Sequence, residues 1–515
     1  MKNYPLYSHP NLTSFRQLLD WNAGNTPTDM AFQYREGKDV VSVTYAQFRD
    51  DVEALASFFL HSGFREAKIA VIGENSYPWI VTYFAAVLSG NIIVPLDKEL
   101  PDEDIAALLT RCGAAALIHS HAYADTAEKM LHTGCVETIL DMREIPARVA
   151  AAGAVAPPVD TDPDAVCALL FTSGTTGVPK GVMLTQRSLV TDAVASARSV
   201  GVYGPTLLTL PIHHAFSFTV CVLAEMVCGL PVFISKSLRH FQEDMRTAQP
   251  QHIFVVPLYV ETLYKNIWKN AREQRKDSAL KFLLAVNNGL RKVGVDLRRK
   301  LFRSILTQLG GKLDLIISGG APLKQSYIDA LEAFGIQVLN GYGITECSPV
   351  VAVNRNQYYR PGSVGQVLPC CEVAIREGEI CVKGENVMQG YYQDEAATRA
   401  VLEDGWFRTG DMGLLDEDGF LFITGRKKNL IILSNGKNVA PEELEERLMD
   451  IDGVEEVLVY AEEGLITAEI FAQQTEGIQE RVTALNRELP TYKRIQRVKF
   501  RDREFEKTTT QKIKR

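Results

Sequence analysis

The sequence predicts an α/β protein with a large amino-terminal domain of layered sheets in several subdomains, followed by a small α+β domain. Three observations predict this. Apolar segments with helical spacing alternate with short apolar segments typical of buried strands. After Gly425 the pattern changes to a compact set of two predicted helices and three predicted strands. A chain of 515 residues is also too long for one ordinary core and has room for about three or four structural units.

The alternation begins in the first sixty residues. The first clear helical pattern has apolar residues at Phe48, Val52, Leu55 and Phe59. The apolar run from Lys68 to Glu74 then predicts a strand, and the alternation continues through Leu88, Ile93 and Leu117. Such alternation usually builds a parallel sheet with helices on both faces, and ligands bind at the carboxyl ends of its strands.

A predicted strand then leads into the most informative motif of the chain. The Ala/Pro/Asp-rich stretch from Ala147 to Asp164 is typical of a linker, and Val166 to Phe171 predicts a strand. The sequence FTSGTTGVPKG, from Phe171 to Gly181, follows directly. Its glycines allow close backbone approach to an anion, and its hydroxyls and lysine are phosphate ligands. The candidate ligands are Thr172, Ser173, Gly174, Thr175, Thr176 and Lys180.

The last part of the chain predicts a separate α+β unit. We expect a helix over Pro441 to Met449, paired strands over Val454 to Ala461 and Leu465 to Gln473, a helix over Ile478 to Leu489 and a strand over Ile495 to Arg501.

Composition excludes several classes of protein. Hydrophobic residues at 46% and charged residues at 23% match ordinary globular chains and exclude disorder and coiled coils. The net charge of −8 argues against nucleic acid as a partner. Nine scattered cysteines without CxxC spacing indicate neither a disulfide framework nor a zinc site. The first residues lack the apolar segment of a secretory signal, and the run from Ser217 to Ile234 is interrupted by Glu225, so we expect a cytoplasmic protein with a core helix and strand there.

Four further segments carry residues suited to nucleotide chemistry. GYGITE, from Gly341 to Glu346, offers a flat aromatic ring, a hydroxyl and a hard oxygen ligand for Mg²⁺. WFRTGD ends at Asp411, whose carboxylate could accept hydrogen bonds from ribose hydroxyls. The stretch GRKKNLIILSNGKNVAPEELE follows from Gly425, and the tail KTTTQKIKR ends at Arg515.

These segments and the SGGAPL at Ser318 to Leu323 occur in the order found in a known superfamily. The chain resembles the acyl-adenylate-forming enzymes, which include acyl-CoA synthetases, luciferases and peptide-synthetase adenylation domains, and it most resembles bacterial long-chain fatty-acyl-CoA synthetases. The resemblance implies an AMP-binding domain over 1–425 and a mobile carboxyl-terminal domain over 426–515, with a hinge near Lys428.

The resemblance also implies roles for particular residues. The loop before Lys180 would hold the β- and γ-phosphates of ATP, Thr345 the α-phosphate, and Glu346 the Mg²⁺. Asp411 and Arg426 would bind the ribose. The adenine would lie between Tyr342, followed by Gly343, and the segment Gly320, Ala321 and Pro322.

The tail motif implies a lysine that enters the active site during adenylation. The matching position is Lys512, but Glu506 and Gln511 replace the usual proline and glycine of the motif. The segment with Gly436 near its centre, residues 434–438, would line the route of the incoming thiol.

Two features bear on the substrate. His214 matches the position beside the carboxylate pocket in acyl- and aryl-CoA synthetases, although a buried core histidine explains it equally well. Residues 261–312 contain 13 Lys/Arg against 4 Asp/Glu, with an apolar stripe at Val260, Leu263, Tyr264 and Ile267. A solvated helix that covers the large domain is the favoured explanation, and peripheral contact with an anionic membrane is the alternative.

The leading hypothesis is an ATP- and Mg²⁺-dependent acid–thiol ligase that forms acyl-CoA from a medium- or long-chain fatty acid. Other hypotheses are a ligase that loads a carrier protein's phosphopantetheine arm, a ligase for an aryl or other acid, and a catalytically silent nucleotide-binding relative. Luciferase-like oxidation shares the same motifs and also stays open.

Overall fold

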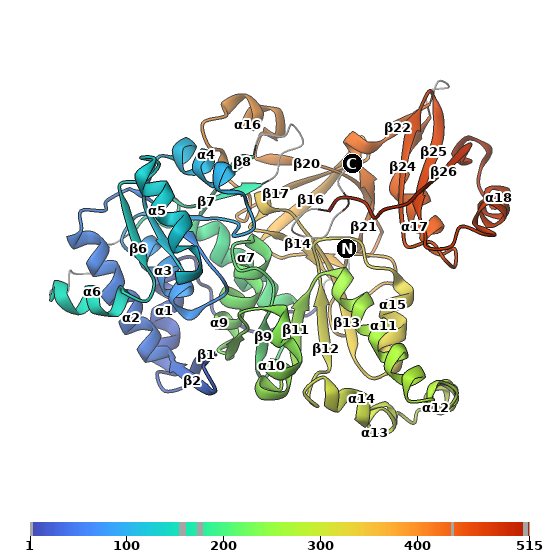
Figure 1. Cartoon of the computed structure of the whole chain (residues 1–515), viewed down its shortest axis with the longest axis horizontal. Coiled ribbons are helices and arrows are strands. Elements are labelled where there is room, and N and C mark those ends of the chain that lie inside the picture. Colours follow the sequence, from blue (N-terminus) through green and yellow to red (C-terminus); the bar gives the residue numbers. More distant parts are fainter. Residues whose placement is uncertain (1–3, 154–160, 173–178, 434–436, 508–512, 514–515) are drawn as a thin grey trace.

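The structure is a computed structural model that describes residues 4–153, 161–172, 179–433, 437–507 and 513. Up to Arg426 the described chain forms two large sheets and one smaller antiparallel sheet, and after it the chain forms a two-stranded and a three-stranded sheet with helices beside them (Figure 1). This arrangement confirms the predicted α/β class with layered sheets.

The first large sheet has seven strands. In spatial order they are β18 (Gly390–Tyr391), β8 (Lys180–Thr185), β7 (Val166–Thr172), β4 (Ile92–Pro95), β3 (Lys68–Ile72), β5 (Ala114–His119) and β6 (Thr138–Asp141). The strands from β7 to β6 are parallel, and β8 and β18 extend one edge in antiparallel pairing. Side chains of β3 alternate between the two faces, so that Ile69 and Val71 join one core and Ala70 and Ile72 join the other.

Helices cover both faces of this sheet. α4 (Asp102–Cys112) and α5 (Ala124–His132) pack on one face. The other face is covered by α1 (Phe15–Asn25), α2 (Tyr45–His61), α3 (Tyr77–Leu88) and α7 (Gln186–Ser199), and α6 (Ile145–Ala152) packs beside α2. The four apolar residues that predicted the first helix lie on α2 and are fully buried.

The second large sheet has nine strands and shares a layer of helices with the first. In spatial order they are β15 (Gln366–Val367), β14 (Val350–Val353), β13 (Gln337–Gly343), β12 (Leu315–Ser318), β11 (His252–Val255), β9 (Thr206–Leu208), β10 (Val232–Ile234), β1 (Met30–Glu36) and β2 (Asp39–Thr44). The strands from β13 to β1 are parallel. One face packs on the core that contains α7, and the other is covered by α10 (Phe241–Ala248), α11 (Pro257–Glu273) and α15 (Gln325–Ala333).

A buried helical segment runs between the two large sheets. It comprises α8 (Ala215–Phe218), a π-helical turn at Thr219–Leu223 and α9 (Ala224–Cys228), and it ends at Gly229, whose φ of 67° is left-handed. The strand β10 follows. This confirms the expected core helix and buried strand, and none of the described helices is long and apolar enough to cross a membrane.

The smaller sheet is antiparallel and lies beside the cavity described below. Its strands are β16 (Cys371–Arg376), β17 (Glu379–Gly384), β20 (Trp406–Leu415), β19 (Leu402–Glu403) and β21 (Leu421–Arg426), with α16 (Glu395–Val401) before β19. The pairing of β20 with β21 places Asp411 directly opposite Arg426.

The carboxyl-terminal unit has its own hydrophobic core. Its elements are β22 (Ile431–Ile432), β23 (Asn438–Val439), α17 (Pro441–Met449), β24 (Glu456–Glu462), β25 (Leu465–Phe471), α18 (Ile478–Glu488) and β26 (Arg497–Arg501). β24 and β25 pair antiparallel and β26 adds in parallel. Buried apolar residues between Ile431 and Ile495 form this core, so the predicted helices and strands of the unit are all present.

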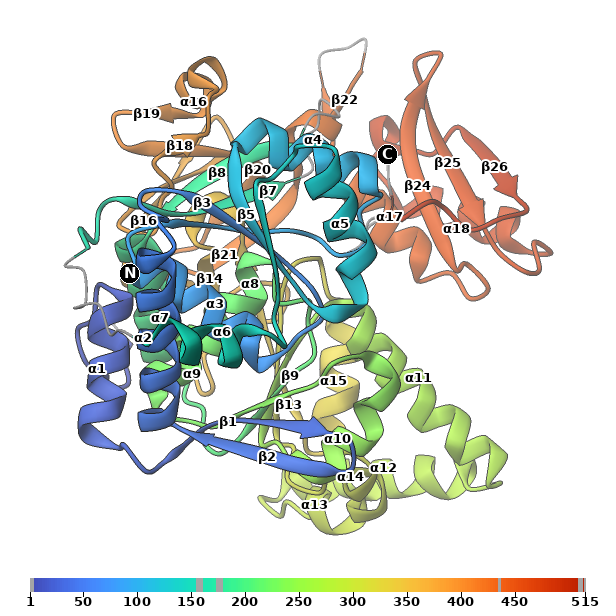
Figure 2. The same ribbon diagram turned by 60° about the vertical axis from the view of Figure 1, so that its left-hand side comes forward.

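The basic segment 261–312 is mostly helical, as expected. It contains most of α11, and then α12 (Asp277–Lys292), α13 (Arg298–Leu301) and α14 (Arg303–Gln308), which occupy the lower right corner of Figure 2. The predicted apolar stripe on α11 packs into the core beneath the nine-stranded sheet. This packing is the one expected of a helix that covers the large domain. The exposed apolar side chains of the segment are instead Phe282, Val286, Val293 and Val295.

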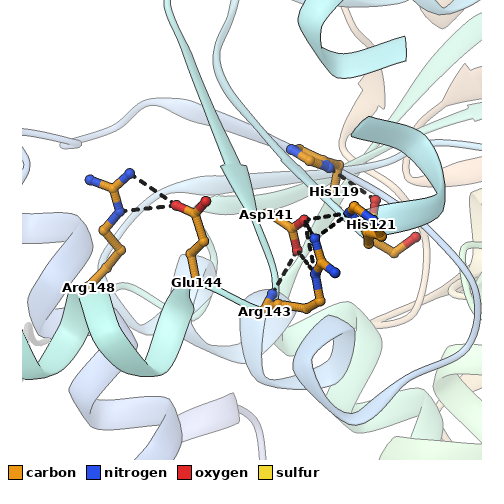
Figure 3. Close-up of polar contacts among 7 residues, drawn as sticks. His119, His121, Asp141, Arg143, Glu144 and Arg148 are labelled. Carbon is orange, nitrogen blue, oxygen red and sulfur yellow. Dashed lines mark hydrogen bonds and ion pairs between the residues drawn. The ribbon is translucent and has the colours of Figure 1, made fainter. Parts of the chain in front are cut away.

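A polar cluster lies at the carboxyl ends of β5 and β6 (Figure 3). Asp141 accepts hydrogen bonds from the backbone and guanidinium of Arg143 and contacts His121 at 3.2 Å. Burial by itself would raise the pKa of Asp141, but the Arg143 hydrogen bonds outweigh it and lower the value to about 2. Nearby, Glu144 and Arg148 form an exposed pair one helical turn apart. The charged groups of the cluster are thus paired with one another, and the contacts of Asp141 hold the end of β6 in place.

Candidate active site

Strand ends from both large sheets meet at one cavity of about 1060 Å³. Thr172 at the end of β7, Val255 and Val256 at the end of β11, and Gly319 after β12 all line it. Because ligands in α/β proteins bind at the carboxyl ends of parallel strands, the cavity lies where the sequence predicted a site. The smaller sheet and the residues after Arg426 close the remaining side.

The two described residues that flank the predicted phosphate loop belong to the cavity lining. Thr172 and Lys180 are paired across the β7–β8 ladder and both line the cavity, so the predicted loop connects two adjacent strand ends. The ammonium of Lys180 lies 4.7 Å from the centre of the Tyr391 ring. The sequence-predicted residues Ser173, Gly174, Thr175 and Thr176 lie outside the described part of the chain, as do Gly436 and Lys512.

Glu346 is a buried carboxylate in the same end of the cavity. It follows Thr345 in a short 3₁₀ turn after β13, and both residues line the cavity. The Tyr391 hydroxyl donates a 2.8 Å hydrogen bond to Oε1 of Glu346. Burial raises the pKa of this carboxyl, and the Tyr391 hydrogen bond and the charges of Arg426 and Lys180 oppose that rise. A buried carboxylate next to a threonine hydroxyl in the cavity lining fits Mg²⁺, which prefers hard oxygen ligands.

Tyr342, Asp411 and Arg426 form a connected group at the cavity wall. The Tyr342 hydroxyl donates to Oδ2 of Asp411 at 2.6 Å, and Nε of Arg426 lies 2.6 Å from Oδ1. Asp411 is 3% exposed, whereas the Arg426 side chain is 42% exposed and lines the cavity together with Tyr342. Burial, followed by the charge of Asp411, raises the pKa of Tyr342, which therefore stays a neutral donor. The group brings together three of the residues that the sequence assigned to adenine and ribose, and those roles stay predictions.

Glycines shape the remaining nucleotide-facing wall. Gly320 and Ala321 line the cavity, whereas Pro322 is not among its lining residues. Gly320 has a φ of 88°, a conformation that other residues rarely adopt. Gly343 has a different reason to be glycine, because a Cβ there would lie 2.2 Å from the carbonyl oxygen of Pro349.

A third buried carboxylate was not found from the sequence. Glu379 on β17 lines the cavity and accepts hydrogen bonds from Lys427 at 2.8 Å and from Arg408 at 2.7 Å. Burial would raise its pKa, but the bonds from Lys427 and Arg408 outweigh burial and lower it. Lys427 begins the turn Lys427–Asn429, which also carries the predicted hinge residue Lys428. Glu379, Arg408 and Lys427 are far apart in the sequence and belong to no recognisable motif, so the sequence did not predict this cluster.

His214, the residue predicted to lie beside the substrate carboxylate, belongs to the cavity lining. It precedes α8, lines the cavity next to Phe216, and its ring centre lies 4.1 Å from that of His213. His213 faces Asp97, with Nε2 and Oδ1 3.6 Å apart. Burial, followed by the charges of His214 and Lys98, holds the pKa of His213 well below its usual value, so this ring is neutral.

Comparison with known proteins identifies the family. A family model described as AMP-binding enzyme matches residues 19–392. The chain belongs to the AMP-binding enzyme family. A long-chain-fatty-acid–CoA ligase, FadD15 of Mycobacterium bovis, is 30% identical over 447 residues, which cover 79% of this chain and 73% of the relative. The assignment to the acyl-adenylate-forming enzymes is thereby confirmed, and the chain is an acyl-adenylate-forming ligase.

Solved structures share the whole fold. A Mycobacterium tuberculosis fatty acyl CoA synthetase matches with a TM-score of 0.72 at 23% identity, covering 97% of this chain and 96% of that one. The O-succinylbenzoate coenzyme A synthetase of Bacillus subtilis, in complex with ATP and magnesium ion, matches with a TM-score of 0.75 at 24% identity, covering 96% and 98%. At such identities the likeness concerns the fold alone.

The Tyr342–Asp411–Arg426 group generates a prediction for nucleotide binding. Asp411→Asn should raise the KM for ATP by about tenfold or more, because it removes the charged acceptor that holds Arg426 against the cavity. Tyr342→Phe keeps the ring and should change this KM much less. Initial rates at varied ATP measure both effects.

Asp416→Asn, at the other end of the β20–β21 pair, is the matched control, since Asp416 binds Arg360 away from the cavity lining. An unchanged KM for ATP in a folded Asp411→Asn variant would remove Asp411 from the nucleotide site.

Proposed function

We propose that the protein joins a medium- or long-chain fatty acid to coenzyme A, using ATP and Mg²⁺ and releasing AMP and pyrophosphate. The single observation that carries this proposal is the two-part character of the cavity. One end presents Lys180, Arg426 and Lys427, and the other end continues as an apolar channel between the two large sheets. An anionic head with an apolar tail fits that arrangement.

The channel is lined by one face of the buried helical segment. Its wall residues recur every four positions, at Phe216, Val220, Ala224 and Cys228. At a rise of 1.5 Å per residue these positions span about 18 Å. Other apolar residues of the lining are Ala197 of α7, Val200 directly after it, and Phe254 of β11. A flexible alkyl chain can fill such a channel along its length, and acetate would leave most of it empty.

The chemistry follows from the need for a good leaving group. A carboxylate oxygen attacks the α-phosphorus of ATP, and the bond from that phosphorus to the pyrophosphate oxygen breaks. The CoA sulfur then attacks the acyl carbon, its proton is lost, and AMP leaves. Negative charge gathers around the phosphates in the first step, so fixed cations and N–H donors supply most of the stabilisation. When bound, Mg²⁺ neutralises phosphate charge.

Residues of this chain have separate tasks in that scheme. Lys180 and Thr345 would hold the phosphates, and the Glu346 carboxylate, fixed by Tyr391, would hold the metal. Asp411 would fix Arg426 for the ribose. His214 would lie beside the reacting carboxylate, at the junction of the charged and apolar ends.

The second half-reaction requires a different face of the carboxyl-terminal unit, which we place at 426–515. Its separate core supports independent movement. Between the two parts, Lys324 forms a 2.6 Å ion pair with Asp450 at the end of α17. The hinge would be Lys428, because Lys427 before it is held by Glu379, and an element-terminal position can absorb a large backbone change.

The names of relatives support a carboxylic acid as substrate and coenzyme A as acceptor, but they do not decide which acid is used. FadD15 is named a long-chain-fatty-acid–CoA ligase, and a solved neighbour with a TM-score of 0.80 is an anthranilate CoA ligase.

A panel of acids tests the proposal: acetate, saturated fatty acids from octanoate to hexadecanoate, benzoate, anthranilate and a bile acid. We expect fatty acids to give the highest kcat/KM with CoA, measured as thioester by mass spectrometry.

Preference for an aryl acid would overturn the fatty-acid assignment. Acyl transfer to a holo carrier protein but not to CoA would overturn the assigned acceptor.

The tail lysine generates a prediction about the two half-reactions. Lys512→Ala should lower acyl-AMP formation by about 100-fold or more while thioester formation from supplied acyl-AMP stays near the wild-type rate, because this charge is needed only while phosphate charge develops. Lys514→Ala, two residues on, is the matched control. Equal losses in both half-reactions would contradict the role given to Lys512.

We also propose that the basic segment rests on an anionic membrane surface in the cytoplasm. The exposed apolar side chains Phe282 and Val293 are 67% and 74% exposed and lie among Lys281, Arg291 and Lys292. Basic residues near an anionic surface contribute about 1 kcal/mol each.

Co-sedimentation with vesicles measures this contact. The protein should bind phosphatidylglycerol vesicles at low salt and phosphatidylcholine vesicles much less, and the Phe282→Ser/Val293→Ser variant should lose most binding. Leu131→Ser, on α5, is a control for loss of an exposed apolar residue. Equal binding by all three proteins, or none by wild type, would contradict the proposal.

A further inference from the structure

Polar side chains interrupt the apolar lining of the channel in its deep part. Glu225 and Ser196 both line the cavity, from α9 and α7, and Glu225 is paired with His252 at the start of β11. We call Glu225, Ser196 and His252 the polar floor. The sequence marked Glu225 only as an interruption of an apolar run, and its carboxylate has no part in the adenylation scheme above.

The polar floor lies far from the reacting end. Phe216 packs against Gly319, where an added Cβ would lie 3.0 Å from its ring. Gly319 follows β12 at the end of the cavity assigned to the reaction, so Phe216 is at the reacting end. Glu225 lies nine positions after Phe216 in the helical segment, which is about 13 Å at 1.5 Å per residue. Val256, directly after β11, lies four positions after His252, which again gives about 13 Å. Two independent elements therefore place the floor at the same depth.

The floor is buried and only partly satisfied. The side chains of Glu225 and His252 are each 1% exposed, and Nε2 of His252 lies 2.9 Å from Oε1 of Glu225. Within the described residues, Oε2 of Glu225 and Oγ of Ser196 have no hydrogen-bond partner. The nearby hydroxyl of Tyr45 donates to the carbonyl of Leu230 instead. Two buried oxygens without a partner are costly, because buried polar groups are normally hydrogen-bonded, and both belong to residues of the cavity lining.

An alkyl chain that reached this floor would leave both oxygens unpaired. A hydroxyl group at the end of the chain could donate to Oε2 of Glu225 or accept from the hydroxyl of Ser196, and either bond gives a partner to an oxygen that has none. We propose that the preferred substrates are carboxylic acids that carry a hydroxyl group at the end distant from the carboxylate. This proposal rests on the proposed acid-activating function and specifies its substrate class.

Matched pairs of acids test the polar floor in the full-length enzyme. Saturated acids from octanoate to hexadecanoate are compared with the ω-hydroxy acids of the same length, with kcat/KM measured from thioester formation. At the best-fitting length we expect the hydroxy acid to be preferred by about 10- to 100-fold, the range for a hydrogen bond to a charged acceptor. Glu225→Leu should abolish or reverse this preference and leave the KM for ATP unchanged.

Two further variants guard against misfolding. Glu225→Gln keeps the shape of the side chain but replaces the carboxylate with a neutral amide. Ser196→Ala removes only the hydroxyl of Ser196. Each variant should reduce the preference for the hydroxy acid by about tenfold. Glu261→Gln, a partly buried carboxylate on α11 outside the cavity, is the matched control and should keep the wild-type ratio. Calorimetric titration of each acid into the protein gives a readout that does not depend on turnover.

The outcomes separate this proposal from the function on which it rests. If plain and ω-hydroxy acids are activated equally by wild type, or if the preference survives in the Glu225 and Ser196 variants, the polar floor does not recognise a hydroxyl and the proposal is overturned. If no acid forms a thioester, the proposed function fails. Preference for the hydroxy acid that is lost only in the floor variants supports both.

Discussion

Three of the buried carboxylates at the cavity lie close to Arg426 and Lys427 and require partners, and the architecture of the site depends on this constraint. Glu346, Asp411 and Glu379 are 8%, 3% and 3% exposed. A buried carboxylate is costly unless it is paired and hydrogen-bonded. Each one finds its partner on a different element: Tyr391 on β18, Arg426 on β21 with Tyr342 on β13, and Lys427 in the turn after β21. The pairs thus join all three sheets of the amino-terminal part at the cavity before any ligand is bound.

The same pairs set the electrostatics of the two ends of the cavity. The chain carries a net charge of −8, yet the cavity lining includes Lys180, Arg426 and Lys428. Local arrangement and not overall charge therefore decides which ligand is attracted. The Glu379–Lys427 pair also fixes the start of the carboxyl-terminal unit against the smaller sheet, so a rotation of that unit would pivot just beyond it.

Local patterns predicted the elements and the motifs, and long-range pairing remained hidden. The helix with Phe48 and Val52 and the strand before Thr172 were predictable, because burial periodicity and turn residues are local signals. The partnership of Tyr391 with Glu346 was not, because it depends on how β18 joins the edge of a sheet formed by much earlier strands. Glu225 was read only as a break in an apolar run, since its partner His252 comes from another element. The stripe on α11 could have faced a membrane or a core, and only the packing beneath the nine-stranded sheet distinguished the two.

The central claim is that these elements act together to move the adenylyl group of ATP onto a carboxylic acid. The most direct measurement is the exchange of labelled pyrophosphate into ATP, with Mg²⁺ and without any thiol, in the presence and absence of a fatty acid. The account predicts exchange that requires the acid and that falls strongly in Asp411→Asn. Exchange that never occurs with any acid, or that proceeds equally without one, would contradict it.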